Sequence, residues 1–243
     1  MIRSFLVVLF FISQPNFSFS AQRTDPVLIL SVLTDSTKLA TLGERGANPR
    51  INKAMYWLWY AQQQGLSPKE VIDRALLMNH TPQVKAILIE EALLHNWFTA
   101  NEWGLFLTTN NLQSLRRGGS AKVMKGLYQG ETTEVDHMIP FAVAPEIGNE
   151  IFNLEILPRT LNRQKSDYVG DIQLAYARRL FSLNLISQET FLKVQRARYE
   201  IAPPFLLPLP LEQILDEEDF DGFFSIFDLS KDKNRGLPSV ICI

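Results

Sequence analysis

Three short stretches decide the fold of this chain: Glu134-Val-Asp-His-Met-Ile-Pro140, Asn153-Leu-Glu-Ile-Leu-Pro158 and Leu161-Asn-Arg-Gln-Lys-Ser-Asp167. The first contains a β-branched residue and ends at a proline, which predicts a strand that runs into a loop. The second is a short apolar run and predicts another strand. The third is polar and is entered through a proline and a threonine, which favours a helix. Together they predict strand, loop, strand and helix.

Three side chains in these stretches could act on a phosphodiester. If the unit closes, Asp136 at the end of the first strand faces the helix that carries Asn162, and both oxygens could bind one hard divalent cation. Two protein ligands leave coordination sites for water and phosphate, which suits magnesium. His137 follows Asp136 directly, and a histidine near neutrality can take a proton from water. Because consecutive strand side chains diverge, His137 would address the other side of the phosphate.

The constellation Asp136-His137, Asn153 and Asn162-x-x-Lys165 resembles the HNH nucleases, whose metal-binding unit is a ββα finger. The resemblance covers roughly residues 113–167. It implies that His137 is the general base and that Asp136 and Asn162 hold a single Mg²⁺ or Mn²⁺ ion. It further implies that Asn153 supports the loop that orients His137, through backbone hydrogen bonds. Lys165 matches a basic position in relatives and is expected to contact phosphate.

The chain departs from the family pattern in two ways. Its last signature position is Asn162 rather than a histidine, which favours a single hard metal. The cysteine pairs that bind structural zinc in many relatives are absent, so flanking helices must stabilise the finger. Taken singly, the signature residues can also be interpreted as purely structural. Asn153 could be a turn residue, Asn162 a residue on the surface of a helix, and the end of the third stretch a helix terminus.

The residues just before the first strand form the most basic part of the chain. Four bases occur there with no acid between them, and a phosphate backbone requires cationic contacts. A run of charge also fits a solvated surface, so both readings stay open. Two short strands, 123–125 and 132–135, are expected to form a hairpin that leads into the site. The residues expected to contact nucleic acid are Arg116, Arg117, Lys122, Lys125, Arg163 and Lys165.

Composition sets the limits for the whole chain. The 243 residues carry a net charge of −2, distributed as +1 over residues 1–20, +2 over residues 21–201 and −5 over residues 202–243. There is therefore no overall basic signal for nucleic acid. The single cysteine, Cys242, excludes intramolecular disulfides and a cysteine-rich zinc site.

The N-terminus is typical of a secretory signal. Arg3 precedes the short apolar run 5–12, and the small residues Ser18 and Ser20 lie before Ala21. The apolar run is much shorter than the ~20 residues that a membrane-spanning helix needs. We expect a signal peptide over residues 1–20, a secreted or periplasmic protein, and no stable membrane insertion after cleavage. An uncleaved anchor or a buried N-terminal helix is the alternative.

Helical patterns surround the predicted finger. Helices are expected from about Asn52, after Ser67-Pro68, after Thr81-Pro82, over 105–115, and after Gly170 and Ser187; the Ser67 start has the form of a capping box. The helix from Asn52 is rich in aromatic residues, which could stack bases but are expected to pack in a core. His80 and His95 have no partner at a metal-binding spacing and are interpreted as structural.

The sequence thus predicts a mainly helical α+β protein with a ββα-metal finger braced by helices. Its expected parts are the signal peptide 1–20, a helical region 21–112, the nuclease unit 113–167, helices 168–201, and a Pro-rich, acidic and aromatic tail 202–243 that is extended or partly disordered. The expected function is a divalent-metal-dependent endonuclease of low sequence specificity that acts on DNA, with RNA as an alternative substrate. The alternatives are a nucleic-acid-binding protein without turnover, or an interaction protein of the cell envelope.

Overall fold

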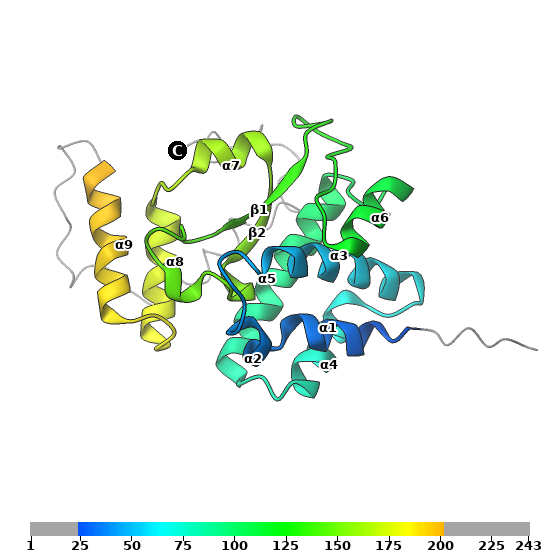
Figure 1. The fold of residues 1–243 in the computed structure, drawn as a ribbon, viewed down its shortest axis with the longest axis horizontal. Helices are drawn as coiled ribbons and strands as arrows, with labels where there is room; N and C mark the ends of the chain where they lie inside the picture. Colours follow the sequence, from blue (N-terminus) through cyan, green and yellow to red (C-terminus); the bar gives the residue numbers. More distant parts are fainter. Residues whose placement is uncertain (1–23, 202–243) are drawn as a thin grey trace, which may run out of the picture.

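A computed structural model describes residues 24–201, which form a mainly helical α+β structure with one small antiparallel sheet (Figure 1). The predicted fold class is confirmed at this level. The expected signal peptide and tail lie outside the described residues. None of the described helices is long and apolar enough to cross a bilayer. The elements are α1 (Pro26–Thr34), α2 (Ser36–Leu39), α3 (Asn48–Gln63), α4 (Pro68–Met78), α5 (Gln83–Glu102), α6 (Thr109–Arg117), β1 (Thr133–His137), η1 (Pro145–Ile147), η2 (Ile151–Asn153), β2 (Leu154–Pro158), α7 (Arg159–Lys165), α8 (Asp171–Ser182) and α9 (Gln188–Ile201).

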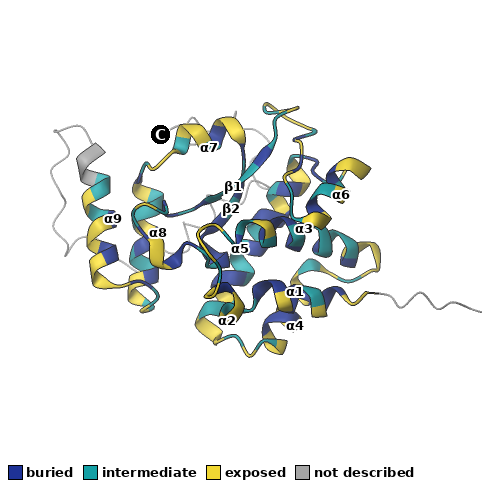
Figure 2. Ribbon diagram, in the orientation of Figure 1, coloured by how far each residue is buried: buried dark blue, intermediate teal, exposed yellow. Residues whose placement is uncertain are grey.

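Helices α1, α3, α4 and α5 form the main core, and their dark inner faces are visible in Figure 2. Helix α3 buries Ile51, Met55 and Leu58, whose spacing places them on one side of the helix. The hydroxyl of Ser67 accepts a hydrogen bond from the Glu70 amide at the start of α4, so the predicted helix start is confirmed. This core provides the support that a small two-stranded sheet cannot supply for itself.

Within residues 24–201 the sheet has two strands, β1 and β2, paired so that Asp136 lies opposite Glu155 and His137 opposite Leu154. Helix α5 covers the free edge of β2 through Asn96, which is fully buried. Its side chain donates to the Leu154 carbonyl at 2.9 Å and accepts from the Ile156 amide at 2.7 Å. One asparagine thus satisfies strand groups that would otherwise be unpaired in the core.

Helix α7 follows β2 directly and is held at both ends by carboxylates from the first strand or from just before it. At its start, Glu131 accepts from the amide and the hydroxyl of Thr160, which fits the positive end of a helix. Arg159, the first residue of the helix, donates to Glu134 at 2.9 Å, and at the last residue the Lys165 ammonium donates to Asp136 at 2.5 Å. The predicted order of strand, loop, strand and helix is therefore confirmed, with Pro158 at the N-cap of α7.

Helices α8 and α9 lie at the opposite end of the molecule from α3 and α6 (Figure 1). The Tyr176 hydroxyl of α8 donates to the Phe152 carbonyl at 2.6 Å, and Arg179 forms a bidentate ion pair with Glu91 of α5. These contacts tie α8 to the loop before β2 and to the core. The starts expected after Gly170 and Ser187 are confirmed, because α8 begins at Asp171 and α9 at Gln188.

Two local expectations were met only in part. The chain before the site does fold back as a hairpin, because the Val123 amide donates to the Glu131 carbonyl at 2.9 Å and the Thr133 amide donates to the Ala121 carbonyl at 2.8 Å. Its first arm makes one bridge, Lys122 with Thr132, and residues 123–125 do not form a strand. The helix expected over 105–115 begins only at Thr109, since the Thr108 hydroxyl caps it by accepting from the Asn111 amide. The residues before it belong to the turn that leaves α5 at Gly104, where φ is +66°.

Candidate functional site

Three carboxylates project from the sheet toward α7. Alternation along β1 puts Glu134 and Asp136 on one face, and Glu155 joins them because it is the cross-strand partner of Asp136. All three make contacts with side chains of α7. The opposite face of the sheet carries Val135, Ile156 and the buried His137. The sheet therefore separates an acidic face from an apolar one.

The ammonium group of Lys165 lies among three oxygens on the acidic face. Its nitrogen is 2.5 Å from Asp136 Oδ2 and 3.2 Å from Glu155 Oε1, and it also donates to the His137 carbonyl. The three side chains are 12–20% exposed. Burial lowers the pKa of Lys165, but the neighbouring charges of Glu155 and Asp136 outweigh it and raise the pKa above its ordinary value. Lys165 is thus held as a cation by hard oxygen atoms.

A second pair of contacts involves Glu134. The Asn162 amide donates to Glu134 Oε2 at 2.6 Å, while Arg159 bonds the other oxygen. The hydrogen bond from Asn162 lowers the pKa of Glu134, and so does the Arg159 charge, against the raising effect of burial. Asn162 and Glu134 are therefore direct partners.

His137 is only 3% exposed and lies between the loop and the sheet. Its Nε2 is 2.9 Å from the Gly148 carbonyl, and the Phe141 ring centroid is 5.5 Å from its own. A carbonyl only accepts, so Nε2 carries the proton and Nδ1 is left with the lone pair. Burial lowers the pKa of His137, although the Gly148 bond and the Asp136 charge act in the opposite direction. The neutral imidazole is the favoured form at neutral pH.

Gly148 is required where the loop passes Phe141. A Cβ placed at Gly148 would lie 2.5 Å from Phe141 Cδ2, well inside van der Waals contact. The glycine thus lets the aromatic ring approach the same backbone segment whose carbonyl binds His137. Sequence reasoning did not identify Gly148 or Phe141.

Asn153 makes the contacts expected of a residue that holds the loop. It is fully buried; its side-chain oxygen accepts from the Ile139 amide at 2.8 Å, and its nitrogen donates to the Ile139 carbonyl at 3.1 Å. The Met138 amide donates to the Asn153 carbonyl at 2.8 Å. These bonds fix the chain immediately after His137. Its catalytic role remains a prediction.

The structure does not bring the two expected metal ligands into direct contact. Asp136 is bound by Lys165, and Asn162 by Glu134. Among residues 24–201, no three His, Cys, Asp or Glu side chains form a metal-binding group. The oxygens around the Lys165 ammonium nevertheless have the chemistry that Mg²⁺ and Mn²⁺ prefer. A single-metal site at Asp136 stays a prediction, with Glu155 and the His137 carbonyl as further oxygens near it.

The bases expected to contact nucleic acid fall into two groups. Lys165 is half-buried, and Arg163 is exposed on the same helix. The other four are exposed at the end of α6 and in the segment that follows, and they form no salt bridge within the described residues; they are Arg116, Arg117, Lys122 and Lys125. Lys122 is fixed by Asn111, which bonds both its amide and its carbonyl.

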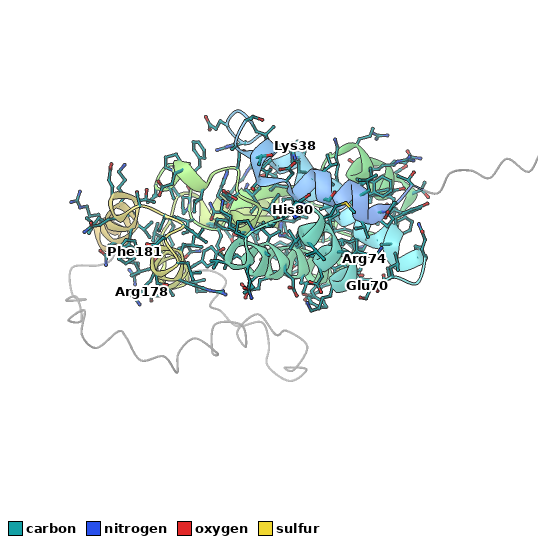
Figure 3. All side chains as sticks on the ribbon, turned by 90° about the horizontal axis from the view of Figure 1, so that it is seen from below. Lys38, Glu70, Arg74, His80, Arg178 and Phe181 are labelled. Atoms are coloured by element: carbon teal, nitrogen blue, oxygen red, sulfur yellow. The ribbon has the colours of Figure 1, made fainter. Side chains whose placement is uncertain are left out.

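The other histidines differ in position. His80 is exposed in the turn after α4, on the face shown in Figure 3. His95 lies on α5 near Glu155: burial lowers its pKa, while the Glu155 charge raises it. The Glu155 carboxylate thus acts electrostatically on His95 and forms an ion pair with Lys165. The spacing of these residues in the sequence did not indicate that they are neighbours. Strand alternation was the one signal that could have identified Glu134 and Glu155.

Comparisons with protein-family models, curated proteins and solved structures found no significant match.

Proposed function

We propose that this protein is a divalent-metal-dependent endonuclease that hydrolyses phosphodiester bonds of DNA at the β1–β2–α7 unit, with low sequence specificity. The supporting observation is the coincidence of sequence and geometry in this unit. The residues that resemble the HNH signature lie on β1, on η2 just before β2, and on α7. The side chains of Asp136, Asn162 and Lys165 all meet on one face of the β1–β2 sheet.

His137 would act as the general base. Its Nε2–H bond to Gly148 leaves Nδ1 to accept a proton from water, and its lowered pKa keeps it neutral. Asn153 would hold the loop so that this imidazole keeps its orientation. A hard divalent ion at Asp136 would polarise the phosphate and support the leaving oxygen. Lys165, once displaced from Asp136, would be a cation beside the same phosphate.

The export signal in the sequence supports a secreted or periplasmic location as part of this proposal. Nicking of supercoiled plasmid tests the activity. The protein lacking residues 1–20 should nick DNA with Mg²⁺ or Mn²⁺, and EDTA should stop the reaction. His137→Ala should reduce the rate by at least about 10²-fold; a variant as fast as the parent would remove His137 from the mechanism.

One observation favours a second candidate, a binding protein without turnover. The imidazole of His137 is almost completely buried, and Lys165 covers Asp136. A protein that stayed in this state would bind nucleic acid with a steep dependence on salt. It would not cleave nucleic acid, whichever divalent metal is added. The nicking assay with a series of divalent metals separates the two candidates.

A further inference from the structure

Helices α3 and α6 lie side by side and come from two segments that contain no acid. Neither residues 45–69 nor residues 103–130 include an Asp or Glu. Figure 1 shows α6 beside α3 at one end of the molecule, and the two helices pack against each other. The chain as a whole has slightly more acids than bases, so this region differs from the rest in the sign of its charge.

Helix α3 carries a cluster of aromatic rings that the core does not fully cover. Tyr56, Trp57, Trp59 and Tyr60 are all half-buried. Tyr56 stacks on Tyr60 with centroids 6.3 Å apart, and Trp57 meets the edges of Tyr56 and Tyr60 at 5.2 and 5.4 Å. The expectation that these residues simply form core is therefore only partly met. The rings hold one another in place, which lowers the entropy cost of stacking a ligand on them.

Helices α3 and α6 carry cations near this ring cluster. The Arg116 guanidinium of α6 lies 5.8 Å from the centre of the Tyr56 ring, within the range of a cation–π contact. Lys53 precedes Trp57 by one helical turn and Arg117 follows Arg116, and neither forms a salt bridge within the described residues. Cations elsewhere, such as Arg159 and Arg179, are matched with carboxylates. Cations without a carboxylate partner beside aromatic rings suit an anionic ligand with flat faces.

We propose that the α3–α6 surface, defined by Tyr56, Trp57, Tyr60, Arg116 and Arg117, binds single-stranded nucleic acid. Bases would stack on the rings, and phosphates would pair with the arginines. Duplex DNA would bind less well, because its bases are already stacked on one another. Nothing at this surface reads base edges, so the binding would depend little on sequence.

The surface connects to the β1–β2–α7 unit through Lys122. Lys122 pairs with Thr132, and alternation along the strand places Thr132 on the same face as Glu134 and Asp136. A nucleic-acid strand bound at the α3–α6 surface and extending toward Asp136 would therefore pass the Lys122 ammonium group. This inference rests on the proposed nuclease function and adds that single-stranded nucleic acid is the preferred substrate.

Fluorescence anisotropy with labelled dT20 in EDTA tests this binding without cleavage, and the labelled duplex dT20·dA20 is the comparison ligand. The parent should bind the single strand more tightly than the duplex. Trp57→Leu with Tyr60→Leu should weaken dT20 binding by at least about tenfold, since base–aromatic stacking contributes about 1–3 kcal/mol per base. Arg116→Gln, a change at an exposed residue, should also weaken binding.

Matched controls come from α8, where Figure 3 places Arg178 and Phe181 together, at the end of the molecule far from α3 and α6 in Figure 1. Arg178→Gln and Phe181→Leu should leave dT20 binding unchanged. The inference is overturned if the parent fails to bind dT20, if it binds duplex as tightly, or if the ring and Arg116 variants bind like the parent. Loss of plasmid nicking with dT20 binding intact would instead contradict the nuclease proposal alone.

Discussion

The ammonium nitrogen of Lys165 lies 2.5 Å from Asp136 Oδ2, so the carboxylate expected to bind a metal is neutralised by a side chain three residues beyond Asn162. Glu155 shares the same ammonium at 3.2 Å. Two carboxylates that receive one positive charge between them retain an excess of negative charge. This arrangement, a cation among hard oxygen atoms, resembles a metal-ion site.

Removing the ammonium should strengthen metal binding. We expect Lys165→Met to bind Mn²⁺ about tenfold more tightly than the parent, because the cation that competes for Asp136 and Glu155 is gone. Isothermal titration calorimetry measures the affinity. Arg163→Met, which removes an exposed charge from the same helix, is the matched control and should have a smaller effect. Equal effects of the two changes would mean that Lys165 does not compete for the site.

The loop after His137 should depend on Asn153 for its stability. Asn153→Ala removes two hydrogen bonds and leaves the Ile139 amide and carbonyl buried without a partner. The free energy of unfolding should fall by about 2–4 kcal/mol. Urea denaturation measures it, with the exposed Asn110→Ala as control. An Asn153→Ala variant within about 0.5 kcal/mol of the parent would show that the loop is held by other contacts.

Much of this unit could be predicted from the sequence, for reasons that are local. A β-branched start, a proline in the loop and the short apolar run over 154–157 define two strands, and Pro158 marks the start of α7. The partners of the site residues could not be predicted. Lys165 meets Asp136 and Glu155 because of the register of β1 on β2 and the direction of α7, which depend on contacts far apart in the chain.

The surroundings of the aromatic residues of α3 also could not be predicted from the sequence. Composition alone cannot tell whether Trp57 and Tyr60 face the core or the surface. In the structure the buried face of α3 is filled by Ile51, Met55 and Leu58, which leaves Trp57 and Tyr60 half-buried. Likewise, Asn96 is an ordinary polar residue in sequence, and only the position of α5 beside β2 explains its burial.

Gly148→Ala should disturb the surroundings of His137. The new methyl group would push against Phe141, so we expect a loss of stability of about 1–3 kcal/mol together with slower plasmid nicking. Gly43→Ala is a suitable control, because its Cβ would meet no atom within 4 Å. Thermal unfolding and the nicking rate give the two readouts. Wild-type behaviour of Gly148→Ala would show that Phe141 can move away without consequence for His137.

Stability should rise with pH below neutrality. The pKa of His137 is lowered from its ordinary value of 6.5, chiefly by burial, so the unfolded chain binds its proton more readily than the folded one. The free energy of unfolding should therefore increase from the folded-state pKa up to about pH 6.5. His95, also lowered in pKa by burial, acts in the same direction.

Urea denaturation between pH 5 and pH 7.5, a range chosen to bracket about pH 6.5, measures this dependence. His137→Gln should flatten it, whereas His80→Gln, in an exposed turn, should keep the slope of the parent. A His137→Gln variant with the full slope would assign the pH dependence to other groups.

The proposed function places a divalent cation on the acidic face of β1 and β2, and a crystal structure of the protein soaked in Mn²⁺ tests this most directly. Anomalous density next to Asp136, with the Lys165 ammonium displaced from that carboxylate, is the predicted result. Lys165 still bound to Asp136 at saturating Mn²⁺, with no anomalous density on this face, would contradict it.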